Sequence, residues 1–103
     1  MLHRVGGPTL ATQMIAVFLP YAAQKIEEAH RALATEDELA IHTAAHAIKA
    51  SAGQLGAVRL QQLCMEAEEK RLPELALFPD TAKIELRHAA QWLQSIEVTE
   101  IDA

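Results

Sequence analysis

Apolar residues recur at every third or fourth position along most of this chain, and this spacing restricts the fold more than any other feature. The clearest case is Ile41, Ala45, Ile48, Ala52 and Leu55, which share one face when the segment is drawn as a helix. Alanine, which favours helix, supplies 20 of the 103 residues, whereas valine and threonine, which favour strands, together supply only ten. The sequence therefore predicts an all-α fold.

Turn-forming residues divide the helical pattern into five segments. The expected helices are a short one from Leu10 to Phe18, then Tyr21 to Leu33, about Glu36 to Leu55, about Leu60 to Arg71, and about Asp80 to Ile96. Pro20 is expected to interrupt or kink the chain after the first helix. The segment Thr35-Glu36-Asp37 offers a helix N-cap, Gly56 marks a break, and Asp80 is expected to cap the last helix.

These segments predict an antiparallel four-helix bundle with a short additional N-terminal helix as a lid. The length suits a single domain over residues 1–103, with a core at about 8–97 and a frayed N-terminal loop and C-terminal tail. Met14 and Met65 are expected to fill the core, and Cys64 is expected to be an inert buried thiol. A monomer is expected, because such a bundle can bury its own apolar faces.

Charge, hydropathy and cysteine content argue against several functions. A net charge of −5 disfavours nucleic-acid binding, which depends on neutralising phosphates. No apolar run reaches the roughly 20 residues of a membrane span, and no basic leader precedes an apolar stretch. The single cysteine is typical of a reducing compartment, so a cytoplasmic location is expected. No Gly-rich phosphate loop, zinc-type Cys/His spacing or nucleophile elbow is present, which disfavours an autonomous ATP-using or hydrolytic enzyme.

One face of the expected helix 36–55 carries the residues with chemical potential. At about 100° per residue, with His42 set at zero, His46 lies at about 40°, Lys49 at about 340° and Gly53 at about 20°. This face lies away from the apolar one, so His46 is expected to point into solvent with a lysine one turn later. An exposed histidine by itself is usually only a solvated surface residue. His42 and His46 could share a metal ion, but no third ligand completes the set, and no metal site is predicted.

The segment that begins at His46 resembles a known family. It reads His-Ala-Ile-Lys-Ala-Ser-Ala-Gly-Gln-Leu-Gly-Ala over residues 46–57 and is followed by Leu60, Leu63 and Cys64. This pattern resembles the histidine-containing phosphotransfer (HPt) domain, in which an apolar residue, a lysine, small residues and Gly-Ala follow the histidine. Further points of resemblance are Gly6-Gly7-Pro8, Phe18 and Asp37, so the likeness covers about Gly6 to Glu97. Ala50 departs from the pattern, because the family usually has glycine there.

The resemblance implies a phosphotransfer module of a two-component phosphorelay. His46 would accept a phosphoryl group from the phospho-aspartate of a receiver domain and pass it to the aspartate of another receiver. Lys49 would be the cation near the phosphoryl oxygens, and Gly53 would keep the adjacent surface flat. Glu68 stands where the family often has a polar residue that contacts the imidazole; it either orients the ring or is one of several solvated carboxylates. No cofactor is expected in this chain, because the receiver supplies Mg²⁺.

The implied partners are receiver domains of response regulators or hybrid histidine kinases. Leu39 and Ala50, at about 60° and 80°, share the outward side of the helix with His46. We predict a docking surface made of Leu39, His42, Ala47, Ala50 and Gly53. Two other functions stay open. One is a non-catalytic helical adaptor that docks partners without phosphorylation, and the other is a domain phosphorylated in trans by an ATP-using kinase, since the resemblance extends to the phosphoacceptor domains of chemotaxis kinases.

Overall fold

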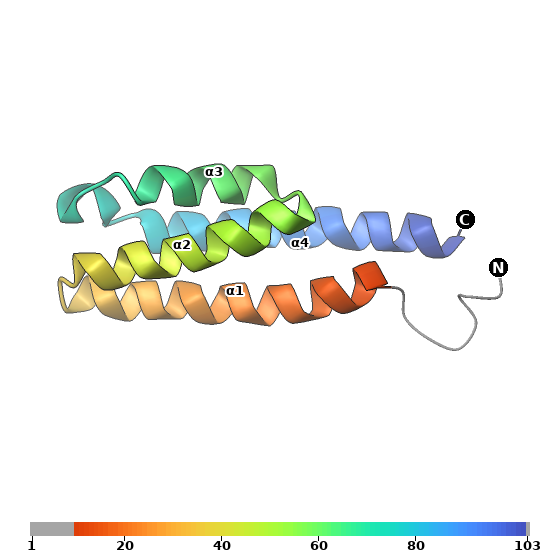
Figure 1. The fold of residues 1–103 in the computed structure, drawn as a ribbon, viewed down its shortest axis with the longest axis horizontal. Helices are drawn as coiled ribbons and strands as arrows, with labels where there is room; N and C mark the ends of the chain where they lie inside the picture. The colour runs from red at the N-terminus through yellow and green to blue at the C-terminus, as the bar shows by residue number, and fades with distance from the viewer. Residues whose placement is uncertain (1–9, 103) are drawn as a thin grey trace.

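The computed structural model describes the backbone of residues 10–102 and the side chains of residue 10 and residues 12–95. In this part of the chain lie four α-helices and one 3₁₀ turn: α1 (Leu10–Ala34), α2 (Glu38–Leu55), α3 (Val58–Ala67), η2 (Leu72–Leu75) and α4 (Phe78–Asp102). Successive helices run in opposite directions and lie side by side in an elongated bundle (Figure 1). The predicted all-α antiparallel bundle is confirmed.

The N-terminal end of the bundle differs from the prediction. The short helix and the one expected to follow it form a single helix, α1, that passes through Pro20 without a break. A proline inside a helix removes one backbone hydrogen bond and costs about 3 kcal/mol. Here Phe18 and Ala22, on either side of the exposed Pro20, are both buried in the same core. Burial on both sides of the proline therefore outweighs its local cost.

The ends of α2 follow the predicted signals closely. Asp37 is the N-cap, and its carboxylate accepts a hydrogen bond of 3.1 Å from the backbone N–H of Ala40. Gly56 ends the helix in the left-handed conformation, with φ of 77°, which a residue with a side chain rarely adopts. These two caps fix the length of α2 and hence the positions of the side chains along it.

The two ends of α4 differ from the prediction. The helix α4 begins at Phe78, so Asp80 lies in its first turn and is not its N-cap. Asp80 instead pairs with His30 of α1, with 3.1 Å between Oδ1 and Nε2. The backbone of α4 is helical to Asp102, through the tail that was expected to fray, and the expected N-terminal loop lies outside the described residues.

One apolar core runs between the four helices. Half of its buried side chains are alanines, which let the helices approach closely. The core residues are Ile15, Phe18, Ala22, Ile26, Ala29, Ala32, Ile41, Ala44, Ala45, Ile48, Ala52, Ala57, Leu60, Cys64, Ala67, Leu75, Phe78, Ala82, Ala89 and Leu93. Cys64 is buried, as expected, and burial raises the pKa of its thiol to about 12.

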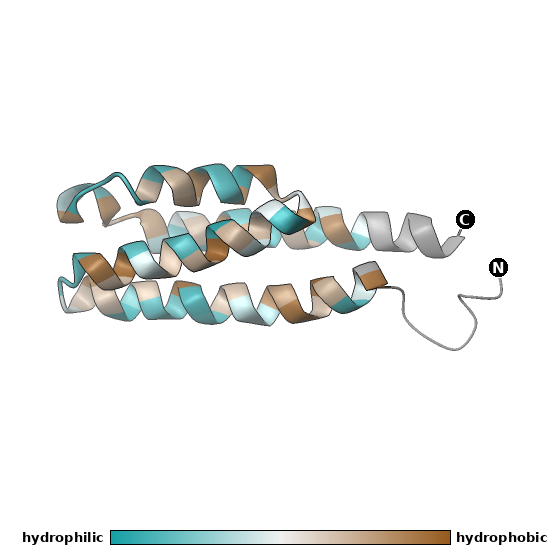
Figure 2. Ribbon diagram, viewed as in Figure 1, coloured by the Kyte–Doolittle hydropathy of each residue, from teal (hydrophilic) through white to brown (hydrophobic). Residues whose placement is uncertain are grey.

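Several apolar residues lie at the surface, among them the two methionines that were expected in the core. Leu10 is 71% exposed, Val17 is 70% exposed and Met14 is 38% exposed, and Met65 on α3 is 45% exposed. The predictions that Met14 and Met65 fill the core were therefore wrong. The first half of α1 has apolar residues on more than one face, and only the face with Ile15 and Phe18 packs inward (Figure 2).

Candidate functional site

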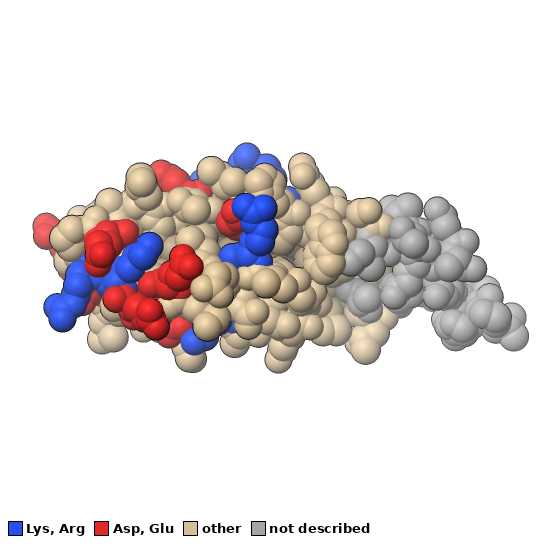
Figure 3. All heavy atoms as spheres, turned by 90° about the horizontal axis from the view of Figure 1, so that it is seen from above, with Lys and Arg blue, Asp and Glu red and all other residues tan. Residues whose placement is uncertain are grey.

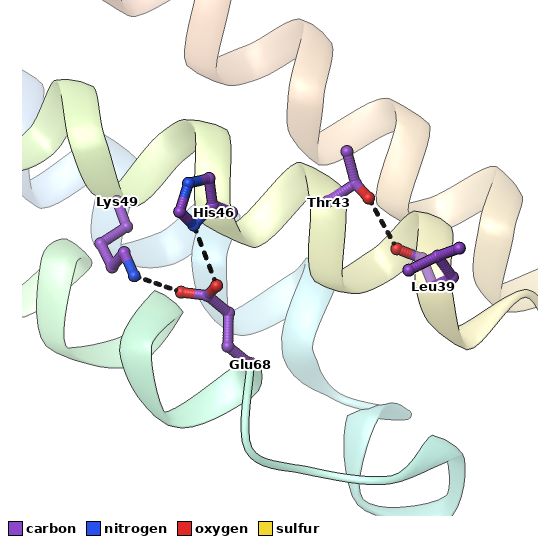
Figure 4. Close-up of polar contacts among 5 residues, drawn as sticks. All are labelled: Leu39, Thr43, His46, Lys49 and Glu68. Atoms are coloured by element: carbon purple, nitrogen blue, oxygen red, sulfur yellow. Dashed lines mark hydrogen bonds and ion pairs between the residues drawn. The ribbon is translucent and has the colours of Figure 1, made fainter.

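His46 projects into solvent from the middle of α2. The apolar residues of this helix pack into the core, so the opposite side, which carries His46, lies at the surface, and the imidazole is 67% exposed. Its Nδ1 atom lies 3.0 Å from Oε2 of Glu68, and Nε2 points away from that carboxylate (Figure 4). One ring nitrogen is therefore held by the protein while the other is open to an incoming molecule.

Glu68 approaches His46 from the neighbouring helix. It is the C-cap residue of α3 and lies 22 positions further along the chain. Its second oxygen, Oε1, lies 2.6 Å from Nζ of Lys49 on α2 and is shielded from solvent (Figure 4). One carboxylate thus joins the histidine and the lysine, and the role of Glu68 in orienting the ring stays a prediction.

The charges around Glu68 keep it ionised. A hydrogen bond from Lys49 is the main cause that lowers the pKa of the Glu68 carboxyl, and a hydrogen bond from His46 lowers it further, against the opposing effect of burial. An ionised carboxylate can only accept hydrogen bonds. The contact with His46 therefore requires a hydrogen on Nδ1, since an oxygen that only accepts must face a donor.

This requirement selects one tautomer of the neutral imidazole. With its hydrogen on Nδ1, the ring carries a free electron pair on Nε2, the nitrogen that points into solvent. Among the described residues, the hydrogen bond and ion pair of His46 involve Nδ1 and not Nε2, so the lone pair is available as a nucleophile or as a hydrogen-bond acceptor. The arrangement can attack an electrophile delivered from outside the bundle.

The link between Lys49 and Glu68 predicts a specific pH dependence. Because the pKa of Glu68 in the folded state lies below its ordinary value of 4.5, the pair stabilises the fold above that value, and the stabilisation is lost as the pH falls through the folded pKa. In Lys49→Met the midpoint of the Glu68 titration, followed by carboxyl-carbon NMR, should move up. The free energy of unfolding should also fall less between pH 6 and about pH 3 than it does in the wild type.

Lys25→Met is the control for this experiment, because Lys25 is also half-buried and pairs with a different carboxylate, Glu28, at 3.3 Å. It changes the net charge equally and should leave the Glu68 midpoint unchanged. An equal midpoint in Lys49→Met and the wild type would show that Lys49 does not hold the charge on Glu68.

The other predicted residues of the docking surface differ in exposure. Leu39 is 75% exposed, Ala50 is exposed and Ala47 is half-buried. Thr43 lies between Leu39 and His46 on the helix, and its hydroxyl donates a 2.9 Å hydrogen bond to the carbonyl of Leu39 (Figure 4). Leu39 and Ala50 therefore flank His46 at the surface, and their docking role stays a prediction.

His42 and Gly53 make contacts that the helix geometry alone did not suggest. His42 is half-buried, and its Nε2 lies 2.8 Å from the backbone carbonyl of Lys70. A side chain at position 53 would begin 2.6 Å from Nε2 of Gln61 on α3, so the glycine leaves room for that side chain to cross α2. Both residues thus contact the following segment of the chain, and their part in docking also stays a prediction.

The sequence reasoning missed an apolar surface on α1. Residues 10–24 contain no charged side chain, and this signal could have identified the surface. Val17 and its neighbours on α1 meet α2 in a shallow hollow of about 310 Å³, whose lining residues are Gln13, Met14, Val17, Ser51, Gln54 and Leu55. The uncharged surface of α1 therefore borders the C-terminal part of α2 at Ser51, Gln54 and Leu55.

Charged side chains gather away from the uncharged surface of α1. Figure 3 shows acidic and basic residues grouped at the end of the bundle where α2 begins, near the segment that follows α3.

Within residues 10–102, no helix is both long and apolar enough to cross a membrane. In that same part of the chain, no group of three or more histidine, cysteine, aspartate or glutamate side chains is arranged to hold a metal ion.

Comparison with protein families finds a match over most of the chain. The model of the Hpt domain matches residues 13–97, a span that contains most of α1, all of α2 and α3, and most of α4. His46, Lys49 and Glu68 all fall within it. Comparisons with curated proteins and with solved structures found no match.

Proposed function

Because the chain belongs to the histidine-containing phosphotransfer family, whose members work with receiver domains in phosphorelays, we propose that it carries a phosphoryl group on Nε2 of His46. The observation that supports this best is the pairing of Nδ1 with Glu68, which leaves Nε2 in solvent with its lone pair. The proposed donor is the phospho-aspartate of one receiver, and the proposed acceptor is the aspartate of another.

The proposed reaction needs little from this chain. The lone pair of Nε2 attacks phosphorus, the nitrogen–phosphorus bond forms, and the bond from phosphorus to the aspartyl oxygen breaks, so that the aspartate leaves as a carboxylate. The nucleophile is the neutral imidazole, because only that form carries a lone pair on Nε2. In the second step a receiver carboxylate attacks phosphorus and Nε2 leaves. The receiver would supply the aspartate and Mg²⁺, and the positioning of the groups dominates the rate.

Glu68 and Lys49 support this chemistry from the Nδ1 side of the ring, opposite the reacting nitrogen. As Nε2 bonds to phosphorus, positive charge develops on the imidazole, and the carboxylate 3.0 Å from Nδ1 stabilises it. Lys49 holds that carboxylate from its other side, with 2.6 Å between Nζ and Oε1. We propose that Lys49 acts through Glu68 in addition to the implied role near the phosphoryl oxygens.

The function is tested by incubating the purified chain with a panel of receivers carrying a radioactive phosphoryl group. We expect an acid-labile, alkali-stable label to appear on His46 with at least one receiver and to pass to a second, unlabelled receiver. A label that appears only with a histidine kinase and ATP would identify a kinase-phosphorylated domain. No label under either condition would leave the non-catalytic adaptor.

The proposed docking surface gives a separate prediction. Leu39→Arg should weaken binding of the cognate receiver at least about tenfold, because the interface would lose a buried leucine and gain a charge. The measurement is titration calorimetry with the receiver. Ile84→Arg is the control, because Ile84 is 48% exposed on α4, which packs mainly against α1 and α3 rather than against α2. Equal affinity of Leu39→Arg and the wild type would show that the receiver docks elsewhere.

A further inference from the structure

We propose that His42 is a positioning residue for the transfer reaction and acts through the segment 68–72, which carries Glu68. The inference rests on the proposed function, because the group being positioned is the carboxylate that holds His46. It changes the assignment of His42 from a surface that meets the partner to a part of the fold that orients the nucleophile.

Glu68 sits where regular structure ends. The helix α3 finishes at Ala67, and two turn hydrogen bonds follow, from the N–H of Glu69 to the carbonyl of Glu66 and from the N–H of Lys70 to the carbonyl of Ala67, each of 3.1 Å. Arg71 then takes an extended conformation, with φ of −97° and ψ of 168°. The helix therefore supports Glu68 on one side only, and the other side depends on what holds the loop.

Two side chains of α2 hold that loop. The ring nitrogen Nε2 of His42 donates to the carbonyl of Lys70 at 2.8 Å, across 28 positions of sequence. The carboxylate of Glu38 accepts a 2.9 Å hydrogen bond from the N–H of Leu72. Both hydrogen bonds are partly buried, so water replaces them poorly if they are broken.

The spacing on α2 connects these anchors to the site. Glu38, His42 and His46 follow one another at intervals of four, so they form a single row along the helix. The first two residues fix the backbone of the loop, and the third receives the carboxylate that the loop presents. The distance of 3.0 Å between Glu68 and His46 therefore depends on a register set one and two turns earlier on the same helix.

Loss of the His42 hydrogen bond should act on the tautomer of His46. Without its partner, the carbonyl of Lys70 would turn toward water and the loop would move, and the contact of Glu68 with Nδ1 would weaken. The hydrogen of His46 would then be shared between Nδ1 and Nε2, and the nucleophilic lone pair on Nε2 would be present for less of the time. In His42→Gln the side-chain amide places an N–H at about the position of Nε2 of histidine, so it can donate to the carbonyl of Lys70. In His42→Leu the side chain has no donor.

The test measures the tautomer and the reaction separately. Imidazole-nitrogen NMR of His46 gives the share of the Nδ1–H tautomer, and transfer from a labelled receiver gives kcat and KM. In His42→Leu we expect a smaller Nδ1–H share and a fall in kcat of about three- to tenfold, the size expected for one hydrogen bond, with KM unchanged. In His42→Gln both quantities should return to within about twofold of the wild type.

His30→Leu is the matched control, because His30 also pairs across helices, but with Asp80 of α4 and not with the 68–72 segment. It should leave both the tautomer share and kcat unchanged. If His42→Leu does not fold, Glu38→Met removes the other anchor and should change both readouts in the same direction. Melting curves identify the folded variants.

Three results would overturn the proposal. These are an unchanged His46 tautomer in folded His42→Leu, a change in KM alone, which would indicate a docking role, and a glutamine variant no better than the leucine variant. The NMR measurement needs no transfer. If no receiver phosphorylates the wild type, the proposed function fails, while the comparison of tautomers still decides whether His42 positions His46.

Discussion

Replacement of His46 by asparagine should abolish phosphorylation of the chain, to the background of the assay. The amide nitrogen of asparagine can reach about the position of Nδ1 and keep the hydrogen bond to Glu68, which is 3.0 Å long in the wild type. Its lone pair is delocalised into the carbonyl and does not attack phosphorus, and the second ring nitrogen is missing. The variant therefore removes the nucleophilic nitrogen Nε2 and keeps the hydrogen bond to Glu68, so it tests the nucleophile alone.

The measurement is the amount of acid-labile label after incubation with the receiver that phosphorylates the wild type. His88→Asn is the matched control, since His88 is also an exposed histidine near a glutamate, 3.8 Å from Glu85 on α4, and it should label normally. Because His46 is 67% exposed, His46→Asn should change the free energy of unfolding by no more than about 0.5 kcal/mol. A normal label on a folded His46→Asn would mean that another residue accepts the phosphoryl group.

The largest expected effect on stability is that of Ile48→Ala. Ile48 lies between His46 and Lys49 in the sequence but points into the core, where its side chain is completely buried. Replacing a buried isoleucine by alanine costs about 2–5 kcal/mol, because the lost methyl groups leave a cavity that the neighbours fill only in part. This is a large share of the 5–15 kcal/mol that typically stabilises a small domain.

Urea unfolding followed by circular dichroism gives the free energy for Ile48→Ala. Leu39→Ala is the control on the same helix; since Leu39 is 75% exposed, its change should stay within about 0.5 kcal/mol. We also expect the folded Ile48→Ala protein to keep the Nδ1–H tautomer of His46, because the opposite face of α2 carries that contact. A loss below about 1 kcal/mol would contradict the packing described for the core.

Local signals in the sequence were sufficient to predict α2 and the orientation of its side chains. The capping groups of Asp37 and Gly56 and the spacing of the apolar residues depend on neighbours within a few positions. The same geometry placed His46 and Lys49 on one side of the helix, and the structure brings both to Glu68. These features are short-range, and the helix repeat alone determines them.

The contacts between helices could not be predicted in this way. The acidic residues Glu66, Glu68 and Glu69 look alike in composition and spacing, so only the family resemblance singled out Glu68, and the register of α3 against α2 is what brings it to the imidazole. That register depends on the turn at Gly56 and on the loop bonds made by Glu38 and His42, which join residues about 30 positions apart. For the same reason the outward position of Val17 on α1 was missed, since its spacing suits either side of an apolar helix.

The position of His46 in the middle of α2 determines which groups a phosphoryl group on Nε2 would meet. The unpaired N–H groups of a helix, which bind anions, occur only in its first turn, and His46 is eight residues beyond the start of the helix at Glu38. Lys49 is paired with Glu68 and is also the cation that the family resemblance places near the phosphoryl oxygens. A phosphoryl group on Nε2 would thus meet no cradle of backbone donors and would depend on Lys49 and water to offset its charge. Such a group would be held by a single covalent bond, which suits the proposed transfer of the phosphoryl group to a second receiver.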